Sequence, residues 1–300
     1  MSTSSRVVFF GNERLVSGLA ESKTPILRGL IEHGYDVAAV VVNHTDAQSR
    51  SARPLEVAAL AAEHNIPVLS PAKTVDILDQ LIELDADCAI LAAYGRIIPQ
   101  RVLDVFSPIG IINIHPSLLP RHRGSTPIES TIIHGDSHAG VSIMQLTAGM
   151  DEGPVYAQRS LELDGTESKF ELHDQLTTSA ADLLFELLPG ILDGSIHPKP
   201  QSNNGVSYTT MISKQDGNLG PATDTAAQLE RKIRAYQGFP KPKITIRDSV
   251  VIVTAATVAP QTDDNGLFVA CRDQTYLRID ELIAPNGKKM SGDAYLRGLR

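Results

Sequence analysis

The first half of the chain alternates short, uninterrupted apolar runs with segments of helical periodicity. The runs RVVFFG, YDVAAVVVN, DCAILAAYG and GIINIH are as long as strands and largely apolar on both faces, as expected of strands covered on both sides. Between them, PLEVAALAAEHN starts with a proline suited to a first helical turn, and VDILDQLIELD places Ile77, Leu81 and Leu84 on one helical face. Strands that alternate with helices predict an α/β fold with a mostly parallel sheet.

The second half of the chain predicts a separate, smaller unit. A helix is expected from about Glu167 to Leu192, and the segment DGSIHPKPQSNNG after it concentrates proline, glycine and asparagine without periodicity. Beyond it, TAAQLERKIRAY has a helical pattern, whereas SVVIVTAATV, GLFVACR and TYLRIDEL are strand-like. Since single hydrophobic cores rarely exceed ~250 to 300 residues, we predict a first domain at residues 1–196, a linker at 197–210 and a small β-rich domain at 211–300.

The charge of the chain is unevenly spread. The net charge of −8 argues against a general nucleic-acid coat. The first 204 residues hold 14 Lys and Arg against 25 Asp and Glu, whereas the last 96 hold 13 against 10. One stretch without acidic residues contains six cations: Arg231, Lys232, Arg234, Lys241, Lys243 and Arg247. Such a stretch is either a solvated face or a patch that meets an anionic partner, and the sequence leaves both interpretations open.

The remaining composition predicts a cytoplasmic protein without a metal. The start MSTSSRVVFFGN has no apolar run long enough for a signal peptide, and no later run approaches the ~18 residues of a membrane span. Cys88 and Cys271 lie far apart in apolar surroundings, which fits buried thiols in a reducing compartment. No cluster of Cys and His has metal-ligand spacing, so no metal is expected.

One predicted strand ends in two polar residues. Side chains alternate along a strand, so Asn113 and His115 of GIINIH face the same way. Pro116 cannot continue a central strand, which places the pair at the carboxyl end, the edge where open α/β sheets bind ligands. A single Asn or His at a strand end often only satisfies local hydrogen bonds, but two on one face favour a site.

The segments that follow add a rigid loop and an acid. HPSLLPRHRGSTP contains Pro116, Pro120, Gly124 and Pro127, so its backbone has few alternative conformations, which suits either ligand binding or a plain rigid connection to a helix that begins near Pro127. Downstream, TAGMDEGPV carries Asp151 in a glycine-bracketed turn. An acid in such a turn commonly bonds its own backbone.

Taken together, these motifs resemble the signature of the formyltransferases that use 10-formyltetrahydrofolate. NIHPSLLPRHRGSTPI and HAGVSIMQLTAGMDEGPV are similar to the family pattern Asn-x-His-x-Ser-Leu-Leu-Pro, Arg-Gly, Gly-Val and Asp-x-Gly. The matching positions are Asn113, His115, Ser117, Leu118, Leu119, Pro120, Arg123, Gly124, Gly140, Val141, Asp151 and Gly153. VSYTTMISKQDG and AAQLERKIRAYQGFP are similar to the linker and second-domain start of the branch that acts on methionyl-tRNA, so the resemblance spans nearly the whole chain.

The resemblance implies a fold and a set of site residues. It implies a Rossmann-like catalytic domain followed by an OB-like barrel, with Asn113, His115 and Asp151 as the catalytic trio. It also implies a folate site in two parts, the loop after the trio's strand and the strand end in AAYGRIIP. The residues concerned are Ser117, Leu118, Leu119 and Pro120 in the loop, and Arg96, Ile97 and Ile98 beside the pterin.

The resemblance further implies the substrates. The donor would be 10-formyltetrahydrofolate and the acceptor methionyl initiator tRNA, bound by a monomer with no membrane association. The six cations between Arg231 and Arg247 would contact tRNA phosphates, and Arg50 and Arg53 in NHTDAQSRSARP are further candidates for tRNA binding.

Two departures and three alternatives qualify this assignment. The loop NHTDAQSRSARP is shorter than is usual in the family but keeps Arg50 and Arg53, which affects the expected tRNA recognition. Where the family usually has Gly-Thr/Ser-Pro-x-Phe after the first strand, this chain has GNERL at positions 11–15, followed by a longer segment, which affects expected methionine and tRNA recognition rather than folate chemistry. The alternatives are an amino-sugar N-formyltransferase with the same trio, a formyltetrahydrofolate hydrolase with water as acceptor, and a catalytically silent binding protein of the same fold.

Overall fold

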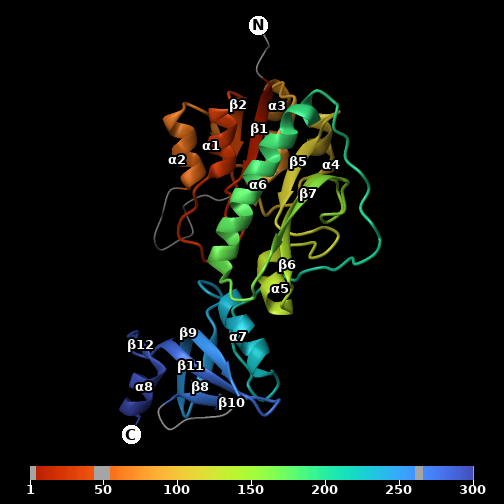
Figure 1. The fold of residues 1–300 in the computed structure, drawn as a ribbon. Helices are drawn as coiled ribbons and strands as arrows, with labels where there is room; N and C mark the ends of the chain where they lie inside the picture. The colour runs from red at the N-terminus through yellow and green to blue at the C-terminus, as the bar shows by residue number, and fades with distance from the viewer. Residues whose placement is uncertain (1–4, 44–54, 261–265, 300) are drawn as a thin grey trace.

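A seven-stranded sheet forms the first domain (Figure 1). The computed structural model describes residues 5–43, 55–260 and 266–299. The sheet has the order β3-β2-β1-β4-β5-β6-β7; β1 to β5 run parallel, and β6 is antiparallel to both of its neighbours. Its strands are β1 (Arg6–Gly11), β2 (Asp36–Val41), β3 (Val68–Leu69), β4 (Cys88–Ala92), β5 (Ile111–His115), β6 (His138–Gln145) and β7 (Val155–Glu162). This arrangement confirms the predicted Rossmann-like, mostly parallel sheet.

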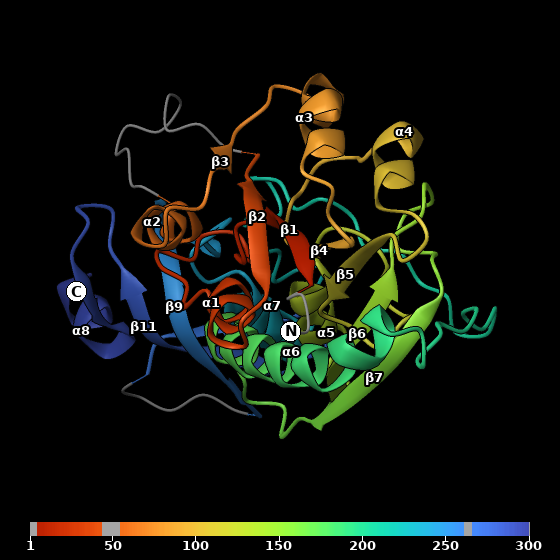
Figure 2. The ribbon, with the colours of Figure 1, turned by 90° about the horizontal axis from the view of Figure 1, so that it is seen from above.

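Helices cover both faces of this sheet, as Figure 2 shows from above. One face packs against α1 (Pro25–Glu32), α2 (Glu56–Glu63), α5 (Pro127–His134) and α6 (Lys169–Leu192). The other packs against η2 (Thr74–Ile77), α3 (Leu78–Glu83), α4 (Gln100–Leu103) and η3 (Asp104–Phe106). None of the helices in the described ranges combines the length and apolarity that crossing a membrane requires.

The sequence pattern explains the longest helix. Ser168 caps α6, because its hydroxyl accepts a hydrogen bond from the amide of Glu171 while the Glu171 carboxylate accepts one from the amide of Ser168. Leu172, Leu176 and Leu184 then follow one buried face against the sheet. The helix predicted at Glu167–Leu192 is therefore confirmed, with its first turn two residues later.

The strand order creates a ligand-binding edge. The chain leaves β1 toward β2 and β3 and returns to add β4 on the opposite side of β1, so the direction of winding reverses between β1 and β4. Ligands of open α/β sheets bind at the carboxyl ends of the strands near this reversal. The ends of β1 and β4 lie so close together there that a side chain on Gly11 would not fit. A Cβ added at Gly11 would lie 1.8 Å from the carbonyl oxygen of Ala92.

The second domain is an antiparallel sheet in the order β10-β11-β9-β8, with β12 paired to β11. Its elements are α7 (Ala226–Ala235), β8 (Lys243–Ile246), β9 (Ser249–Ala259), β10 (Phe268–Ala270), β11 (Tyr276–Ile283), β12 (Lys289–Ser291) and α8 (Gly292–Gly298). The inner face is apolar, with Leu229, Val251 and Leu277 fully buried. The curled half-barrel confirms the predicted small β-rich domain of OB-like type.

A buried lysine joins the two domains. Lys169, at the start of α6, is fully buried; its Nζ donates to the carbonyls of Ser17 (2.7 Å) and Phe239 (3.0 Å), the second of which belongs to the second domain. The Glu129 carboxylate of α5 lies 3.5 Å from the same nitrogen. Between α6 and α7 the chain runs down the side of the first domain (Figure 1). The exact domain and linker boundaries stay a prediction.

Candidate active site

The end of β5 presents two polar side chains to one face of the sheet. Ile112 and Ile114 belong to the core beneath α5 and α6, so strand alternation directs Asn113 and His115 to the opposite face. Both polar residues are buried, with 5% and 4% of their surface exposed. The Asn113 amide has no hydrogen-bond partner among the described residues. The amide atoms of Asn113 are not fully buried, although most of the residue is, so they remain accessible to a ligand.

His115 is held from both sides of its ring. Its Nε2 lies 2.9 Å from the carbonyl oxygen of His122, and its Nδ1 lies 3.6 Å from Oδ2 of Asp151. A carbonyl can only accept, so Nε2 carries the hydrogen. The Nδ1 contact is longer than a hydrogen bond, so the Asp151 carboxylate faces the ring without a direct bond to it.

Asp151 reaches this ring from a strained turn between β6 and β7. Its φ of 50° is in the left-handed region, which costs a non-glycine residue roughly 1 kcal/mol. The Asp151 carboxylate accepts a hydrogen bond of 2.8 Å from the amide of Gly124. A Cβ added at Gly153 would lie 1.9 Å from the carbonyl oxygen of Gln145, so the turn fits against β6 only with glycine there. The structure thus brings together His115 and Asp151, which are remote in sequence.

The loop after β5 is fastened to β6. Ser117 donates from Oγ to the carbonyl of Arg121 (2.6 Å), and the carbonyl of Ser117 accepts from Oγ of Ser142 (2.6 Å). The amide of Leu119 in turn donates to the Ser142 hydroxyl. Leu118 covers Gly140, where a Cβ would approach within 2.4 Å of its side chain. The loop, including Pro120, is therefore rigid, as its proline content predicts.

The three residues predicted to lie beside the pterin, Arg96, Ile97 and Ile98, follow β4 and have different surroundings. The Arg96 guanidinium donates to the carbonyls of Asn43 (2.6 Å), Pro71 (2.8 Å) and Ala72 (2.5 Å), so its side chain closes the neighbouring loops. Ile98 is buried in the core, whereas Ile97 is 90% exposed. An isoleucine exposed to this extent beside a strand end is the apolar surface that an aromatic ligand could cover.

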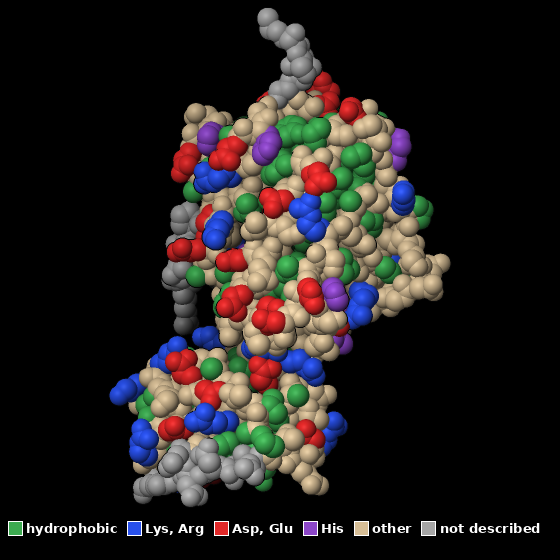
Figure 3. Space-filling view, in the orientation of Figure 1, with side chains coloured by type: hydrophobic (Ala, Val, Ile, Leu, Met, Phe, Trp, Pro, Cys, Tyr) green, Lys and Arg blue, Asp and Glu red, His purple; other side chains and the backbone are tan. Residues whose placement is uncertain are grey.

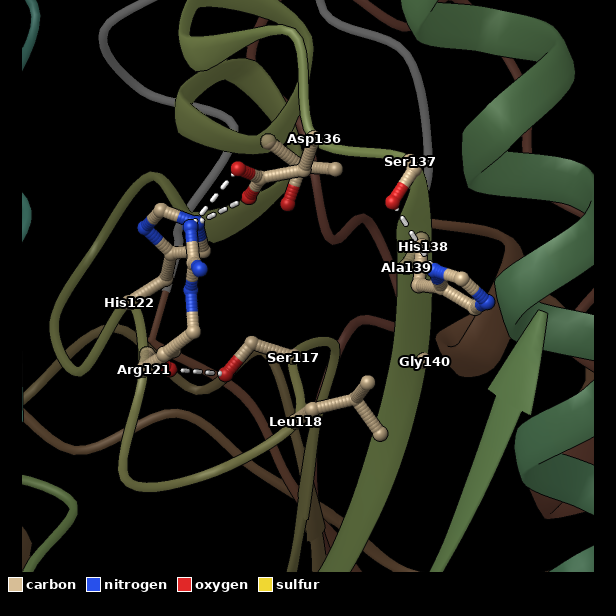
Figure 4. A pocket seen from close by; sticks show the side chains of 10 residues that line it. Ser117, Leu118, Arg121, His122, Asp136, Ser137, His138, Ala139 and Gly140 are labelled. Carbon is tan, nitrogen blue, oxygen red and sulfur yellow. Dashed lines mark hydrogen bonds and ion pairs between the residues drawn. The ribbon is translucent and has the colours of Figure 1, made fainter. Parts of the chain in front are cut away.

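A cavity of about 180 Å³ lies behind the loop that follows β5 (Figure 4). Ser117, Leu118 and the start of β6 form one side of it. On the other, the Asp136 carboxylate accepts from Arg121 (2.6 Å) and contacts Nε2 of His122 (2.7 Å). Burial lowers the pKa of His122, against the opposing effect of Asp136. None of the predicted catalytic trio lines this cavity, so we do not assign it to the reaction.

The unusual segment after β1 contains a buried acid. Glu13 is 1% exposed, and its two carboxylate oxygens accept from the amides of Ile26 and Leu27, both at 2.9 Å, at the start of α1. Burial raises the pKa of Glu13 to about 7, although these amides and Arg28 oppose the shift. The neighbouring Arg14 forms an ion pair of 2.7 Å with Glu56 of α2. In this chain, two residues of the segment that departs from the family pattern, Glu13 and Arg14, thus hold the start of α1 and contact α2.

The six cations of the second domain differ in whether they are free to bind an anionic partner. Lys232 pairs with Asp224 (2.8 Å), Arg234 with Glu230 (2.5 Å), and Arg247 donates to the carbonyl of Leu299. The Arg231 side chain lies against Gly135 of the first domain. Lys241 and Lys243 form no ion pair with any described residue. Figure 3 shows Lys and Arg on this domain and near its junction with the first. Arg50 and Arg53 lie outside the described residues. All eight remain predictions for tRNA binding.

Several residues that surround the trio could not be predicted from the sequence. Gln201, Ser207 and Tyr208 of the linker contact the loop at 120–126 and the Asp151 turn. They lie in a segment without periodicity, where no pattern distinguishes a bonded side chain from a solvated one. Within the described part of the chain, no group of three His, Cys, Asp or Glu residues could hold a metal.

Comparisons with known proteins agree with this geometry. Residues 8–188 match the formyl transferase family, and residues 211–300 match the formyl transferase C-terminal domain. A methionyl-tRNA formyltransferase of Methylococcus capsulatus is 33% identical over 293 residues, covering 93% of this chain and 94% of the relative. Two solved structures share the fold.

The first of these structures is an N-formyltransferase from Helicobacter canadensis in complex with folinic acid and dTDP-3-aminofucose. Its TM-score is 0.70 at 15% identity, over 92% of this chain and 99% of that one. The second is a variant of HypX from Aquifex aeolicus, with a TM-score of 0.64 at 17% identity. The match covers 99% of this chain but only 48% of HypX, about half its length. From the family matches and the identity over nearly its whole length, the chain belongs to the methionyl-tRNA formyltransferase family.

Proposed function

We propose that the chain transfers the formyl group of 10-formyltetrahydrofolate to the α-amino group of methionyl initiator tRNA. The relatives that match over more than nine-tenths of the chain carry the name of this activity. The single observation that carries the proposal is that the unpaired amide of Asn113 shares one face of β5 with the His115–Asp151 contact of 3.6 Å, at the ligand-binding edge of the sheet.

Formyl transfer to an amine requires stabilisation of a negative oxygen. Attack of the amine on the formyl carbon gives a tetrahedral centre, and no covalent bond to the protein is needed. The amide of Asn113 supplies one hydrogen-bond donor for this oxygen. The ring of His115 supplies a second once it turns away from the His122 carbonyl that its Nε2 contacts in the free protein. One such donor is typically worth ~3 kcal/mol of barrier.

Asp151 assists through the histidine. A carboxylate 3.6 Å from Nδ1 would stabilise positive charge on the ring during the reaction, when the ring donates a hydrogen bond and a proton to the departing nitrogen. The separation leaves room for the ring to shift toward the substrate while the charge interaction persists. The acceptor amine attacks in its neutral form, which needs no strong base because α-amines titrate near ~8. The proton that its nitrogen loses after attack replaces the one that His115 gives to the departing nitrogen.

The chain's residues fit a folate donor. The exposed Ile97 offers apolar surface beside the end of β4, and the loop from Ser117 to Pro120 is held to β6 by Ser142. When bound there, the folate supplies an activated formyl group. Ile97 would cover its ring, the fixed loop would limit its position, and the unpaired Asn113 amide would orient the formyl oxygen.

The second domain is suited to the phosphates of the acceptor. Its net charge is positive while that of the first domain is negative, and Lys241 and Lys243 have no described ion-pair partner. Each phosphate contact would add to the salt dependence of binding. The proposal also takes the protein to be a cytoplasmic monomer, as a role in translation initiation requires no other location.

Single substitutions test the roles of the trio. Asn113→Ala and His115→Ala should each lower kcat by about 10²- to 10³-fold, since each removes one donor to the oxyanion. Asp151→Asn should lower kcat too, because it removes the charge that stabilises a positive ring during the reaction. His64→Ala, on an exposed residue after α2, is the matched control. A His115→Ala enzyme within a few-fold of wild type would refute the assignment.

Parallel assays of acceptors test the substrate. Given 10-formyltetrahydrofolate, the protein should formylate methionyl initiator tRNA faster than methionyl elongator tRNA, and should leave an amino-sugar nucleotide unchanged. Formylation of the sugar nucleotide but not of charged initiator tRNA would establish the amino-sugar alternative. Release of formate without any acceptor would indicate a hydrolase.

A further inference from the structure

The linker between the domains is bound along the loop that supports His115. Tyr208 and Arg123 form a parallel β-bridge, in which the amide of Arg123 donates to the carbonyl of Ser207 (2.9 Å) and the amide of Thr209 donates to that of Arg123 (2.7 Å). The Ser207 hydroxyl also accepts from the amide of His122 (2.9 Å). Since the His122 carbonyl contacts His115, the linker fixes the peptide that holds the histidine ring.

A glutamine at the start of this linker contacts the Asp151 turn directly. The Nε2 of Gln201 donates to the carbonyl of Asp151 (2.7 Å) and to that of Gly153 (2.8 Å). Its Oε1 accepts from Nε (3.1 Å) and Nη2 (2.8 Å) of Arg123. Both ends of the amide are therefore fully used, and its orientation is fixed.

Arg123 completes a closed network around the turn. Arg123 is only 7% exposed, and its Nη1 donates to the hydroxyl of Tyr208 (3.0 Å). That hydroxyl donates to Glu152 (2.8 Å), the residue between Asp151 and Gly153. The planar guanidinium of an arginine fixes the directions of its hydrogen bonds, whereas the ammonium group of a lysine does not. The linker thus binds the Asp151 turn at two places, at its backbone through Gln201 and at the side chain of Glu152 through Tyr208.

We propose that Gln201 is a positioning residue, which sets the distance between the Asp151 carboxylate and His115 by holding the backbone of the Asp151 turn against the linker. The inference rests on the proposed function, because it assumes that Asp151 acts through His115. Gln201 itself lies on the backbone side of the turn and contacts neither ring nor carboxylate. Displacement by about 1 Å can lower a rate by about 10²-fold.

Two variants distinguish the contribution of the Gln201 Nε2 donor, which bonds to the turn, from that of the Oε1 acceptor, which bonds to Arg123. Gln201→Met removes both hydrogen-bonding ends at similar length. Gln201→Glu removes the donor to the turn but keeps an acceptor for Arg123. It therefore retains the bonds to Arg123 and provides a second test if Gln201→Met folds poorly. Each should lower kcat by about tenfold or more, with less than twofold change in KM for either substrate. Gln100→Met is the control, since Gln100 is an exposed residue of α4 that bonds only to Asp104 among the described residues.

A double-mutant cycle with Asp151→Asn tests whether Gln201 acts through Asp151. In the Asp151→Asn background, Gln201→Met should lower kcat by less than threefold, because the group that it positions is already disabled. The pH–kcat profile should change on Gln201→Met when Asp151 is present, and should be the same in the two Asp151→Asn enzymes. An equal tenfold loss in both backgrounds, or kcat unaffected by Gln201→Met and Gln201→Glu, would overturn the inference. An Asp151→Asn enzyme with wild-type kcat would instead refute the role of Asp151 in the proposed function, and a wild-type protein that formylates no methionyl-tRNA would refute the function itself.

Discussion

The buried carboxylate of Glu13 makes the stability of the first domain depend on pH. The change to test is Glu13→Gln, which keeps the shape of the side chain and removes its titration. Burial raises the pKa of Glu13 from 4.5 to about 7, even though the amides of Ile26 and Leu27 stabilise the anion. A shift of this size corresponds to roughly 3 kcal/mol of preference for the neutral form in the folded state.

The sign follows from proton binding. Between pH 4.5 and about 7 the folded protein holds the Glu13 proton while the unfolded chain has lost it. This contribution to stability is present in full below the unfolded pKa and disappears as the pH rises through the folded pKa. From about pH 5 to about pH 8 the wild type should therefore lose about 2.5 kcal/mol of unfolding free energy through this group alone.

Urea unfolding at constant ionic strength, followed by circular dichroism, measures the effect. The wild type and Glu13→Gln share every other titrating group, so the difference between their unfolding free energies isolates Glu13. That difference, variant minus wild type, should rise by about 2.5 kcal/mol between about pH 5 and about pH 8. Glu63→Gln, on an exposed residue of α2, should show no such trend. A Glu13→Gln difference that stays constant with pH would refute the reasoning.

Three further predictions concern the domain junction, the thiols and the Asp151 turn. Lys169→Met leaves the Glu129 carboxylate buried without its cation, so urea unfolding should show a loss of about 3 to 5 kcal/mol, most of it recovered by adding Glu129→Gln. Burial raises the pKa of both cysteines, that of Cys88 to about 12, so neither Cys88 nor Cys271 should react with Ellman's reagent until the protein unfolds; prompt colour would contradict this. Gly153→Ala places a Cβ 1.9 Å from a carbonyl of β6 and should lower kcat at least tenfold by moving the turn, whereas an unchanged kcat would show that the turn can adapt.

The elements of the fold could be predicted because each has a local cause. The buried strands are apolar on both faces, and α6 combines a capping serine with leucines on one face. Strand alternation likewise placed Asn113 and His115 on one side of β5. Asp151 differs, since nothing in its own turn indicates which ring it approaches, and its assignment came only from the family resemblance.

Long-range polar contacts could not be predicted. Lysine and glutamate are expected at the surface, yet Lys169 is fully buried because carbonyls of two distant segments and Glu129 surround its ammonium group. The basic stretch after Arg231 contains no acid, but Lys232 pairs with Asp224, which precedes that stretch. Local counting therefore overstates the free positive charge of the second domain.

The position of Asp151 shows why the linker belongs to the active site. A sheet aligns residues on one strand, but an acid entering from a separate turn needs its own support, and here the turn also bears the cost of a left-handed backbone. Single hydrogen bonds contribute about 1 kcal/mol each, so the bonds from Gly124 and Gln201 together outweigh that cost. Because Gln201 lies in the segment that leads to the second domain, the geometry of the acid and the connection between the domains are maintained by the same contacts.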